Sequence, residues 1–361
     1  METAIESITD IRRQKRLRWI DMARGYGVIL VILGHLSEDL RLLHDLIYCF
    51  HIPLFFFLSG FVFSSGESFS GHLKKKARSL LLPYFILAMI SFIVALCYKI
   101  ALAEDIDLSY ILRYLKEIIL QQRKGPIWFL PCLFTVDILF YCLVRLTKNK
   151  LLPLSVISAV LTVTGIIYEI KVAHVLLWNS DMVLSVIIFF AAGYIIKESG
   201  KLYTDDIPKK TAVITFIFAL IAMVILEQIN YRIAPSGLNL FLIRYGNPFL
   251  TYPCAFFGIT ACISFSMLFK VPFIEHIGQN TFIYFALHQD LIPLTWPLQS
   301  VVYDIELTDI GKIIKGSHHF FILIVLLAAL FMIETLFRHT RLAPILCPGK
   351  PYRPFFIKNK K

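Results

Sequence analysis

An arginine and a histidine lie within apolar sequence near the start of the chain, at a spacing that would allow them to act together. Arg24 and His35 are eleven residues apart, and a helix that turns about 100° per residue brings both side chains back to nearly one face. Ionisable groups in apolar segments are costly, so they are expected to face a protein interior or a hydrated cavity. The spacing predicts His35 as a general acid–base catalyst and Arg24 as a group that orients it or binds the phosphates of a donor. Asp21 is placed to pair with Arg24, although the two could form only an interfacial ion pair.

A second polar group follows in the next apolar segment. His51 begins this segment beside Pro53, and Ser59 lies about two helical turns further on. Because the connection between the two segments is short, His35 and His51 are expected near the same end of neighbouring helices. Two imidazoles placed in this way could share one substrate.

Two later segments add further candidates. Trp128 begins another apolar run, where it is either an interfacial aromatic or a stacking surface for a sugar ring. The segment Gly278–Asp290 carries Asn280, Tyr284 and His288, and the last two recur at helical spacing to give one polar face. For His288 the alternative is a neutral buried histidine with a structural hydrogen bond.

The elements that must position these residues are membrane helices. Of the 361 residues, 57% are hydrophobic and 17% charged, and the mean hydropathy is +0.71. The apolar runs are long enough to cross a hydrocarbon core of about 30 Å, and they lack the period-two alternation of a membrane β-barrel. These features predict an all-α, polytopic helix bundle in contact with the lipid bilayer.

Ten membrane spans are predicted, with the sixth interrupted near Trp178 and Asp181 and the ninth interrupted by Pro293 and Pro297. The predicted spans are 20–36, 46–64, 80–101, 127–146, 151–168, 179–197, 211–229, 248–269, 280–299 and 318–338. This arrangement places about two thirds of the 36 Lys and Arg residues on the side of the N-terminus, so both termini are expected in the cytoplasm. A 14-residue amphipathic segment before the fourth span, 107–120, is expected on the outer membrane face, where it would either cover a cavity or be a surface connector.

The remaining composition excludes several classes of protein. The net charge of +11 is explained by the positive-inside pattern, so no nucleic-acid partner is expected. The seven cysteines form no CxxC pair, and no metal site is predicted. The sequence has no GxSxG elbow, P-loop, HExxH or dinucleotide-binding motif. A histidine-based site inside a helix bundle is the chemistry that remains.

These residues and their surroundings resemble acyltransferase family 3, the membrane-bound O-acyltransferases that act mostly on carbohydrates. The matching pieces are Arg24 with His35, FHIPLFFFLSGFVF at Phe50–Phe63, LLLPYF at Leu80–Phe85, PIWFLPCLF at Pro126–Phe134 and GQNTFIYFALH at Gly278–His288. The form FHIPLFFFLSG is most similar to the fucose 4-O-acetylase-like branch. The resemblance implies a ten-helix domain that takes an acyl group, usually acetyl, from coenzyme A on the cytoplasmic side. It also implies Arg24 and His35 as the essential pair, with His51, Trp128 and His288 matched more loosely.

The sequence therefore predicts a bacterial inner-membrane O-acetyltransferase that uses acetyl-CoA as a substrate, with no tightly bound cofactor, and a carbohydrate hydroxyl as acceptor. His35 would be the general base or transient acyl carrier. The expected parts are a basic leader (1–19), the membrane domain (20–340) and a basic tail (341–361). The alternatives are a transporter or flippase of a glycan-related solute, because polar stripes in bundles also mark translocation paths, and a membrane sensor or scaffold.

Overall fold

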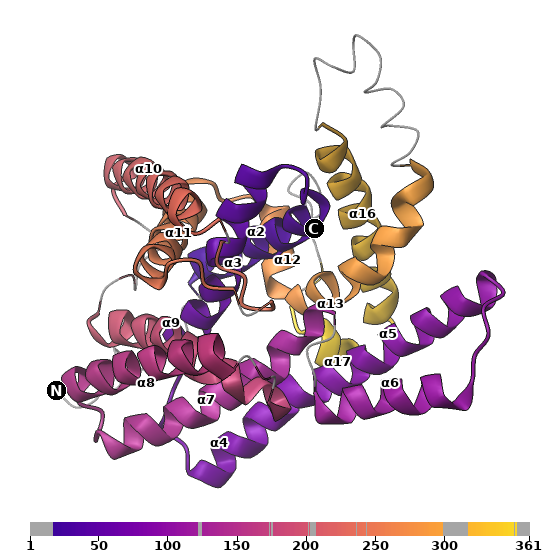
Figure 1. Cartoon of the computed structure of the whole chain (residues 1–361), viewed down its shortest axis with the longest axis horizontal. Coiled ribbons are helices and arrows are strands. Elements are labelled where there is room, and N and C mark those ends of the chain that lie inside the picture. Colours follow the sequence, from indigo (N-terminus) through magenta and orange to yellow (C-terminus); the bar gives the residue numbers. More distant parts are fainter. Residues whose placement is uncertain are drawn as a thin grey trace, which may run out of the picture.

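A computed structural model describes most of the chain and confirms the all-helical prediction. The described residues are 17–121, 125–172, 174, 176–200, 202, 207–235, 237–242, 244–298, 317–349 and 351. Within them, all regular structure is helical apart from one isolated antiparallel bridge between Asn239 and Arg244. The protein is thus a polytopic helix bundle (Figure 1).

In the described part of the chain, nine helical segments are long and apolar enough to cross a membrane. They are α2 (Arg18–Leu36), α3 (Arg41–Phe61), α4 (Phe69–Lys76) with η1 (Ala77–Leu81) and α5 (Leu82–Ala101), η2 (Pro126–Trp128) with α7 (Phe129–Leu146), α8 (Leu151–Val172), η3 (Leu177–Asn179) with α9 (Ser180–Glu198), α10 (Lys209–Ile233), α11 (Pro248–Leu268) and α16 (Ser317–Arg338). Shorter elements are α6 (Leu108–Leu120), α12 (Pro272–Gln279), α13 (Thr281–Leu291), η4 (Ile292–Thr295) and α17 (Ala343–Leu346). Nine of the ten predicted spans correspond to these long segments.

The predicted span 280–299 is not a single long helix. It begins within one residue of the predicted start, because Asn280, whose backbone leaves the helical region, separates α12 from α13. After α13 it tightens into the 3₁₀ turn η4, where Pro293 occupies the first turn. Proline tolerates this position because its missing N–H would be unpaired there in any case. Residue 299, the end of the predicted span, lies outside the described residues.

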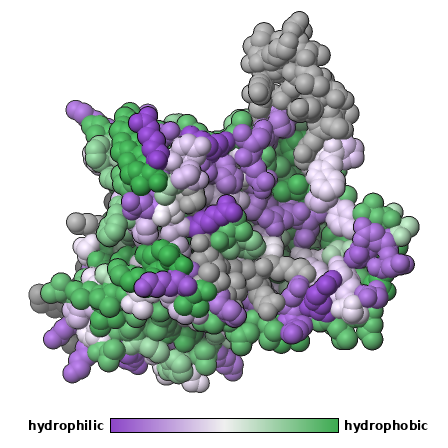
Figure 2. Space-filling model, viewed as in Figure 1, coloured by the Kyte–Doolittle hydropathy of each residue, from purple (hydrophilic) through white to green (hydrophobic). Residues whose placement is uncertain are grey.

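The bundle has a buried centre and a lipid-facing periphery. Helices α2 and α3 lie at the centre, and α9, α11, α12 and α13 pack around them (Figure 1). About a fifth of the apolar window of α8 or of α10 is buried, and hydrophobic residues cover the outward sides of both helices (Figure 2). This exposed apolar surface is expected of helices that contact lipid tails.

Close helix crossings depend on glycine. A Cβ atom at Gly60 of α3 would overlap the Phe190 carbonyl of α9, and one at Gly193 of α9 would overlap the Phe57 carbonyl of α3. The two helices thus approach backbone to backbone through reciprocal glycines, as small residues allow in membrane bundles. This crossing holds the part of α3 that carries Ser59 and Gly60 against the bundle.

The amphipathic segment forms α6, which begins one residue later than predicted because Asp107 is its N-cap. Asp107 caps its first turn by accepting a hydrogen bond from the Tyr110 N–H at 2.8 Å. Hydrogen bonds from Ser109 and Tyr110 lower the pKa of this carboxyl. Tyr114 packs against Phe92 of α5, with ring centroids 4.7 Å apart, while Leu112 is exposed. The helix therefore lies along α5 with an apolar side left open.

Candidate active site

Two separate cavities enter the bundle and hold most of the predicted site residues. The larger, here called the histidine cavity, has a volume of about 550 Å³. Its polar wall includes His35, His44, Tyr48, His51, Trp128 and Gln289. The smaller, the arginine cavity, has a volume of about 330 Å³. Its polar wall includes Arg24, Ser59, Lys76, Asp137, Gln279 and Thr281.

Helix α2 connects the two cavities along one face, as the spacing predicts. Arg24 and Val28 line the arginine cavity, and Val31 and His35 line the histidine cavity. At 1.5 Å per residue, Arg24 and His35 are about 16 Å apart along the helix axis. The predicted pair is therefore one stripe whose two ends face two different cavities.

His35 is held by side chains from α3 and α13. The Tyr48 hydroxyl lies 3.1 Å from Nδ1 of His35. The Gln289 amide nitrogen lies 3.2 Å from Nδ1 and 3.1 Å from Nε2. With Nδ1–H donating to Tyr48, Nε2 is left unprotonated and can accept a proton from a hydroxyl that replaces the Gln289 amide. This arrangement can perform general base catalysis.

His288 and His51 lie close to this centre. The rings of His288 and His35 have centroids 5.1 Å apart, and the His51 ring lies 4.9 Å from that of Tyr48. Nδ1 of His288 bonds the Phe285 carbonyl at 2.8 Å, while its buried Nε2 has no hydrogen-bond partner among the described residues. Nδ1 of His51 bonds the Ile47 carbonyl at 2.8 Å. Both histidines are thereby fixed as donors from Nδ1, with Nε2 as the acceptor.

Trp128 forms part of the wall of the histidine cavity instead of lying free at the interface. Its side chain is 5% exposed, and its ring lies 6.1 Å from that of Phe241, in the connection between α10 and α11. The backbone of that connection is closed by paired bonds between Asn239 and Arg244. Asn239, Phe241 and Arg244 also line the cavity. The hairpin therefore covers the cavity on the side of Trp128.

The arginine cavity contains a lysine fixed by a buried acid. Lys76 Nζ lies 2.6 Å from one oxygen of Asp137, and His72 Nε2 lies 2.5 Å from the other. Asp137 is 1% exposed, whereas Lys75 is largely exposed and pairs with Glu67. Of the basic residues Lys74, Lys75, Lys76 and Arg78, only Lys76 lines the arginine cavity. It is therefore the one that can contact an anion bound there.

Four predicted site residues lie away from the cavity walls: His288, described above, and three residues that make structural contacts. Asp21 is buried and accepts a hydrogen bond from Gln279 at 3.4 Å. Asn280 bonds the His276 carbonyl and accepts from the Gly349 N–H. Tyr284 donates to Glu334 of α16 at 2.7 Å, whereas His288 lies beside His35 of α2. The two residues expected on one polar face of α13 therefore contact different helices. These contacts join α2, α12, α13 and α16.

Sequence reasoning missed Tyr48, Gln289 and Asp137. Gln289 directly follows His288, and Tyr48 lies three residues before His51 on the same helical face, so both could have been found from the neighbouring candidates. Asp137 is a single acid inside a predicted span, which is itself a signal of function in a membrane helix.

One group of possible metal ligands lies outside both cavities. Ligand atoms of Asp39, His318 and His319 are within 4.8 Å of one another, and His319 Nε2 lies 2.7 Å from Asp39. None of the three lines either cavity.

Comparison with known proteins identifies the family of the chain. A family model described as an acyltransferase domain, that of acyltransferase family 3, matches residues 17–336. No curated protein and no solved structure gave a match. The matched region contains both cavities, apart from Pro348 in the wall of the arginine cavity. The chain is a multi-pass membrane protein that belongs to acyltransferase family 3.

Proposed function

We propose that the protein transfers an acetyl group from acetyl-CoA to a hydroxyl of a cell-surface polysaccharide, glycolipid or sugar precursor in the bacterial inner membrane. The observation that carries the proposal is the placement of Arg24 and His35 on one face of α2 but in two separate cavities. The first cavity presents Arg24 and Lys76, and the second presents His35, His44 and His51. This separation suits a reaction in which donor and acceptor enter from opposite sides.

The arginine cavity is proposed as the donor site, open to the cytoplasm. Arg24 and Lys76 supply positive charge for the phosphates of coenzyme A, and Asp137 fixes Lys76 in place. Lys74, Lys75 and Arg78 lie on the same short segment, which by the positive-inside rule belongs on the cytoplasmic side. Acetyl-CoA is here a substrate, consumed and released in each turnover.

The histidine cavity is proposed as the acceptor site, open to the outer face. The acceptor hydroxyl attacks the acyl carbon while Nε2 of His35 takes its proton. The carbon–sulfur bond then breaks, and His35 returns the proton to the leaving thiolate, giving the ester and the free thiol of coenzyme A. Tyr48 holds the imidazole at Nδ1 during these steps, while the acceptor hydroxyl takes the place of the Gln289 amide at Nε2.

The acceptor is proposed to be a sugar. Trp128 presents an aromatic side chain in the cavity wall, and His51, Asn239 and Arg244 provide polar groups around it. A few polar groups within a largely preformed pocket fix the orientation of a small ligand. The segment Phe50–Gly60 resembles the fucose 4-O-acetylase-like branch, which supports a sugar hydroxyl as the attacking group.

The test is transfer of label from radiolabelled acetyl-CoA into the glycan fraction of membranes at matched protein levels. We expect incorporation by the wild type and its loss in Arg24→Ala and in His35→Ala. Matched controls are Arg232→Ala and His339→Ala, because both residues are exposed and line neither cavity. Full activity of His35→Ala would overturn the assignment of the base.

The transporter alternative makes a different prediction. Purified protein in liposomes would then show counterflow of a labelled glycan-related solute. Counterflow without acetyl transfer, with native glycans and several acyl donors supplied, would replace the proposed reaction by transport.

A further inference from the structure

The two cavities meet at one level of the bundle, and aromatic rings occupy that level. On α3, Ile52 lines the histidine cavity and Ser59 lines the arginine cavity, with Phe55 between them on the same face. On α13, Phe285 lines both cavities. Phe129, at the start of α7, lines the arginine cavity directly after Trp128, which lines the other. On each of these three helical segments, an aromatic residue therefore lies where the lining of one cavity ends and the lining of the other begins.

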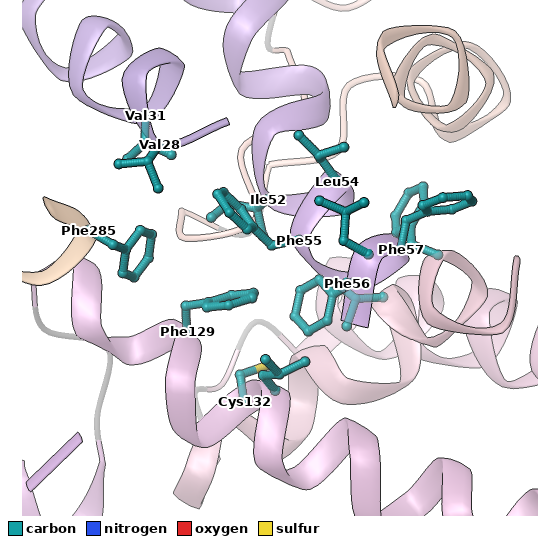
Figure 3. Close-up of a cluster of buried hydrophobic side chains, with 14 of the residues drawn as sticks. Val28, Val31, Ile52, Leu54, Phe55, Phe56, Phe57, Phe129, Cys132 and Phe285 are labelled. Atoms are coloured by element: carbon teal, nitrogen blue, oxygen red, sulfur yellow. The ribbon is translucent and has the colours of Figure 1, made fainter. Parts of the chain in front are cut away.

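The three rings contact one another. Ring centroids are 5.9 Å apart for Phe55 and Phe129, 5.6 Å for Phe129 and Phe285, and 6.1 Å for Phe55 and Phe285, all edge to face. Figure 3 shows the Phe129 ring between Phe285 on one side and α3 on the other, below Val28 and Val31 of α2. Each side chain is less than 10% exposed. The rings thus close the space between the cavities with apolar surface.

Any donor held at Arg24 must pass this level to reach His35. Because Arg24 and His35 are about 16 Å apart along α2, the flexible arm of coenzyme A that carries the thioester must run between the rings. We propose that Phe55, Phe129 and Phe285 form a gate that opens for this arm and limits the length of the acyl group that it carries. The proposal rests on the function proposed above.

The gate would protect the thioester from hydrolysis. A thioester exposed to both cavities could lose its acyl group to water, in which the water oxygen bonds the acyl carbon, the carbon–sulfur bond breaks, and a carboxylic acid and the free thiol result. Closed sites exclude water from such reactive groups. Aromatic rings suit the task because edge-to-face packing is favourable and rotation about two side-chain bonds displaces a large area. The acyl chain must fit whatever opening the rings leave.

The first experiment measures acyl-length preference and hydrolysis without acceptor. In Phe129→Ala and Phe285→Ala, we expect the ratio of hexanoyl to acetyl transfer to rise about tenfold, as for pockets that discriminate by methylene groups. Release of free thiol in the absence of acceptor should rise as well. Phe129→Leu and Phe285→Leu, which keep more volume, should give smaller changes and serve where the alanine variants insert poorly.

Phe56→Ala is the matched control. Phe56 is fully buried, its ring lies 5.0 Å from that of Phe129, and it lines neither cavity. It should lower stability without changing acyl preference or hydrolysis. Equal changes in Phe56→Ala and Phe129→Ala, or none in any ring variant of an active enzyme, would overturn the gate.

A second experiment does not depend on catalysis. In protein whose native cysteines are replaced, Val62→Cys places a thiol in the arginine cavity and Ile52→Cys places one in the histidine cavity. A small membrane-impermeant methanethiosulfonate applied to the cytoplasmic face should label position 62, and should label position 52 only when Phe129→Ala is also present. Labelling of position 52 with all three rings intact would refute the closed gate. Absence of acetyl transfer together with the expected labelling would remove the proposed function but leave the barrier between the cavities.

Discussion

Tyr48 gives the most direct test of how His35 acts. Its hydroxyl lies 3.1 Å from Nδ1 of His35, so it decides which ring nitrogen is free to take a proton. We expect Tyr48→Phe to lower kcat by about 100-fold, at the low end of general base contributions, with little change in KM for acetyl-CoA. The pH profile of kcat/KM should also shift on its acid side, because the partner of the imidazole is lost. Tyr231→Phe is the control, since Tyr231 is exposed and lies outside both cavities. An unchanged pH profile in Tyr48→Phe would remove its positioning role.

Lys76 and Lys75 are neighbours that should behave differently. Lys76 lines the arginine cavity beside buried Asp137, whereas Lys75 pairs with Glu67 outside it. Loss of a charge-assisted contact to phosphate costs about 1.5 to 3 kcal/mol, so Lys76→Met should raise KM for acetyl-CoA by about tenfold or more, with a smaller change in kcat. Lys75→Met should leave both constants near wild type. Similar effects of the two substitutions would mean that the basic run sets only membrane topology.

Glycines determine how closely the helices that carry the site can approach. A Cβ at Gly278 of α12 would overlap the Asp21 carbonyl of α2, and one at Gly60 would overlap the Phe190 carbonyl. Because backbone cannot move aside as a side chain can, Gly278→Ala and Gly60→Ala should each destabilise the protein by about 2 kcal/mol or more. Thermal unfolding in detergent would measure this. Gly66→Ala should have little effect, since its Cβ would come no closer than 3.8 Å to another side chain; a large effect there would contradict the steric explanation.

The sequence predicts long membrane helices well because length and hydropathy determine them. It predicts interrupted elements less well. The basic segment before the third span belongs to one helical unit that begins at Phe69, since Ser68 caps α4 and the π-helical stretch η1 joins it to α5. The irregular start of α9 was foreseen near Trp178, which has a left-handed backbone conformation. The boundary at Asn280 agrees with the predicted start of the ninth span, but the short helix α12 before it was not predicted.

At the scale of the whole molecule, the cavities could not be predicted because they are made by residues far apart in the chain. Gln289 contacts His35 across 254 residues, and His72 contacts Asp137 across 65. The stripe on α2 was predicted from helical spacing, which is a local property. Which helices close around it depends on packing between distant segments. For this reason Arg24, His35, His51 and Ser59 of the first two spans line cavities, whereas Asn280 and Tyr284 form structural contacts.

The same long-range contacts bear on the topology. Nine crossings would put the two ends of the chain on opposite sides of a membrane, yet both described ends contact the segment 275–280. Arg18 pairs with Glu275 of α12 at 2.6 Å, and the Gly349 N–H bonds Asn280 at the junction of α12 and α13. α13 itself runs from Thr281 in the arginine cavity to Gln289 in the histidine cavity. It thus passes the same depth as α2 does between Arg24 and His35, and α12, α13 and η4 together can supply a tenth crossing without a single long helix.

This arrangement leads to a prediction about orientation. Reporter domains fused at the N-terminus and after the last residue should both report the cytoplasm, because an even number of crossings returns the chain to its starting side and the basic clusters favour the cytoplasm. A reporter inserted in the turn at Asp39, between α2 and α3, should report the opposite side. Opposite locations for the two terminal fusions would mean that α12 and α13 re-enter the membrane without crossing it. Donor and acceptor would still reach separate cavities, and the reporter at Asp39 would then decide which membrane face the histidine cavity opens to.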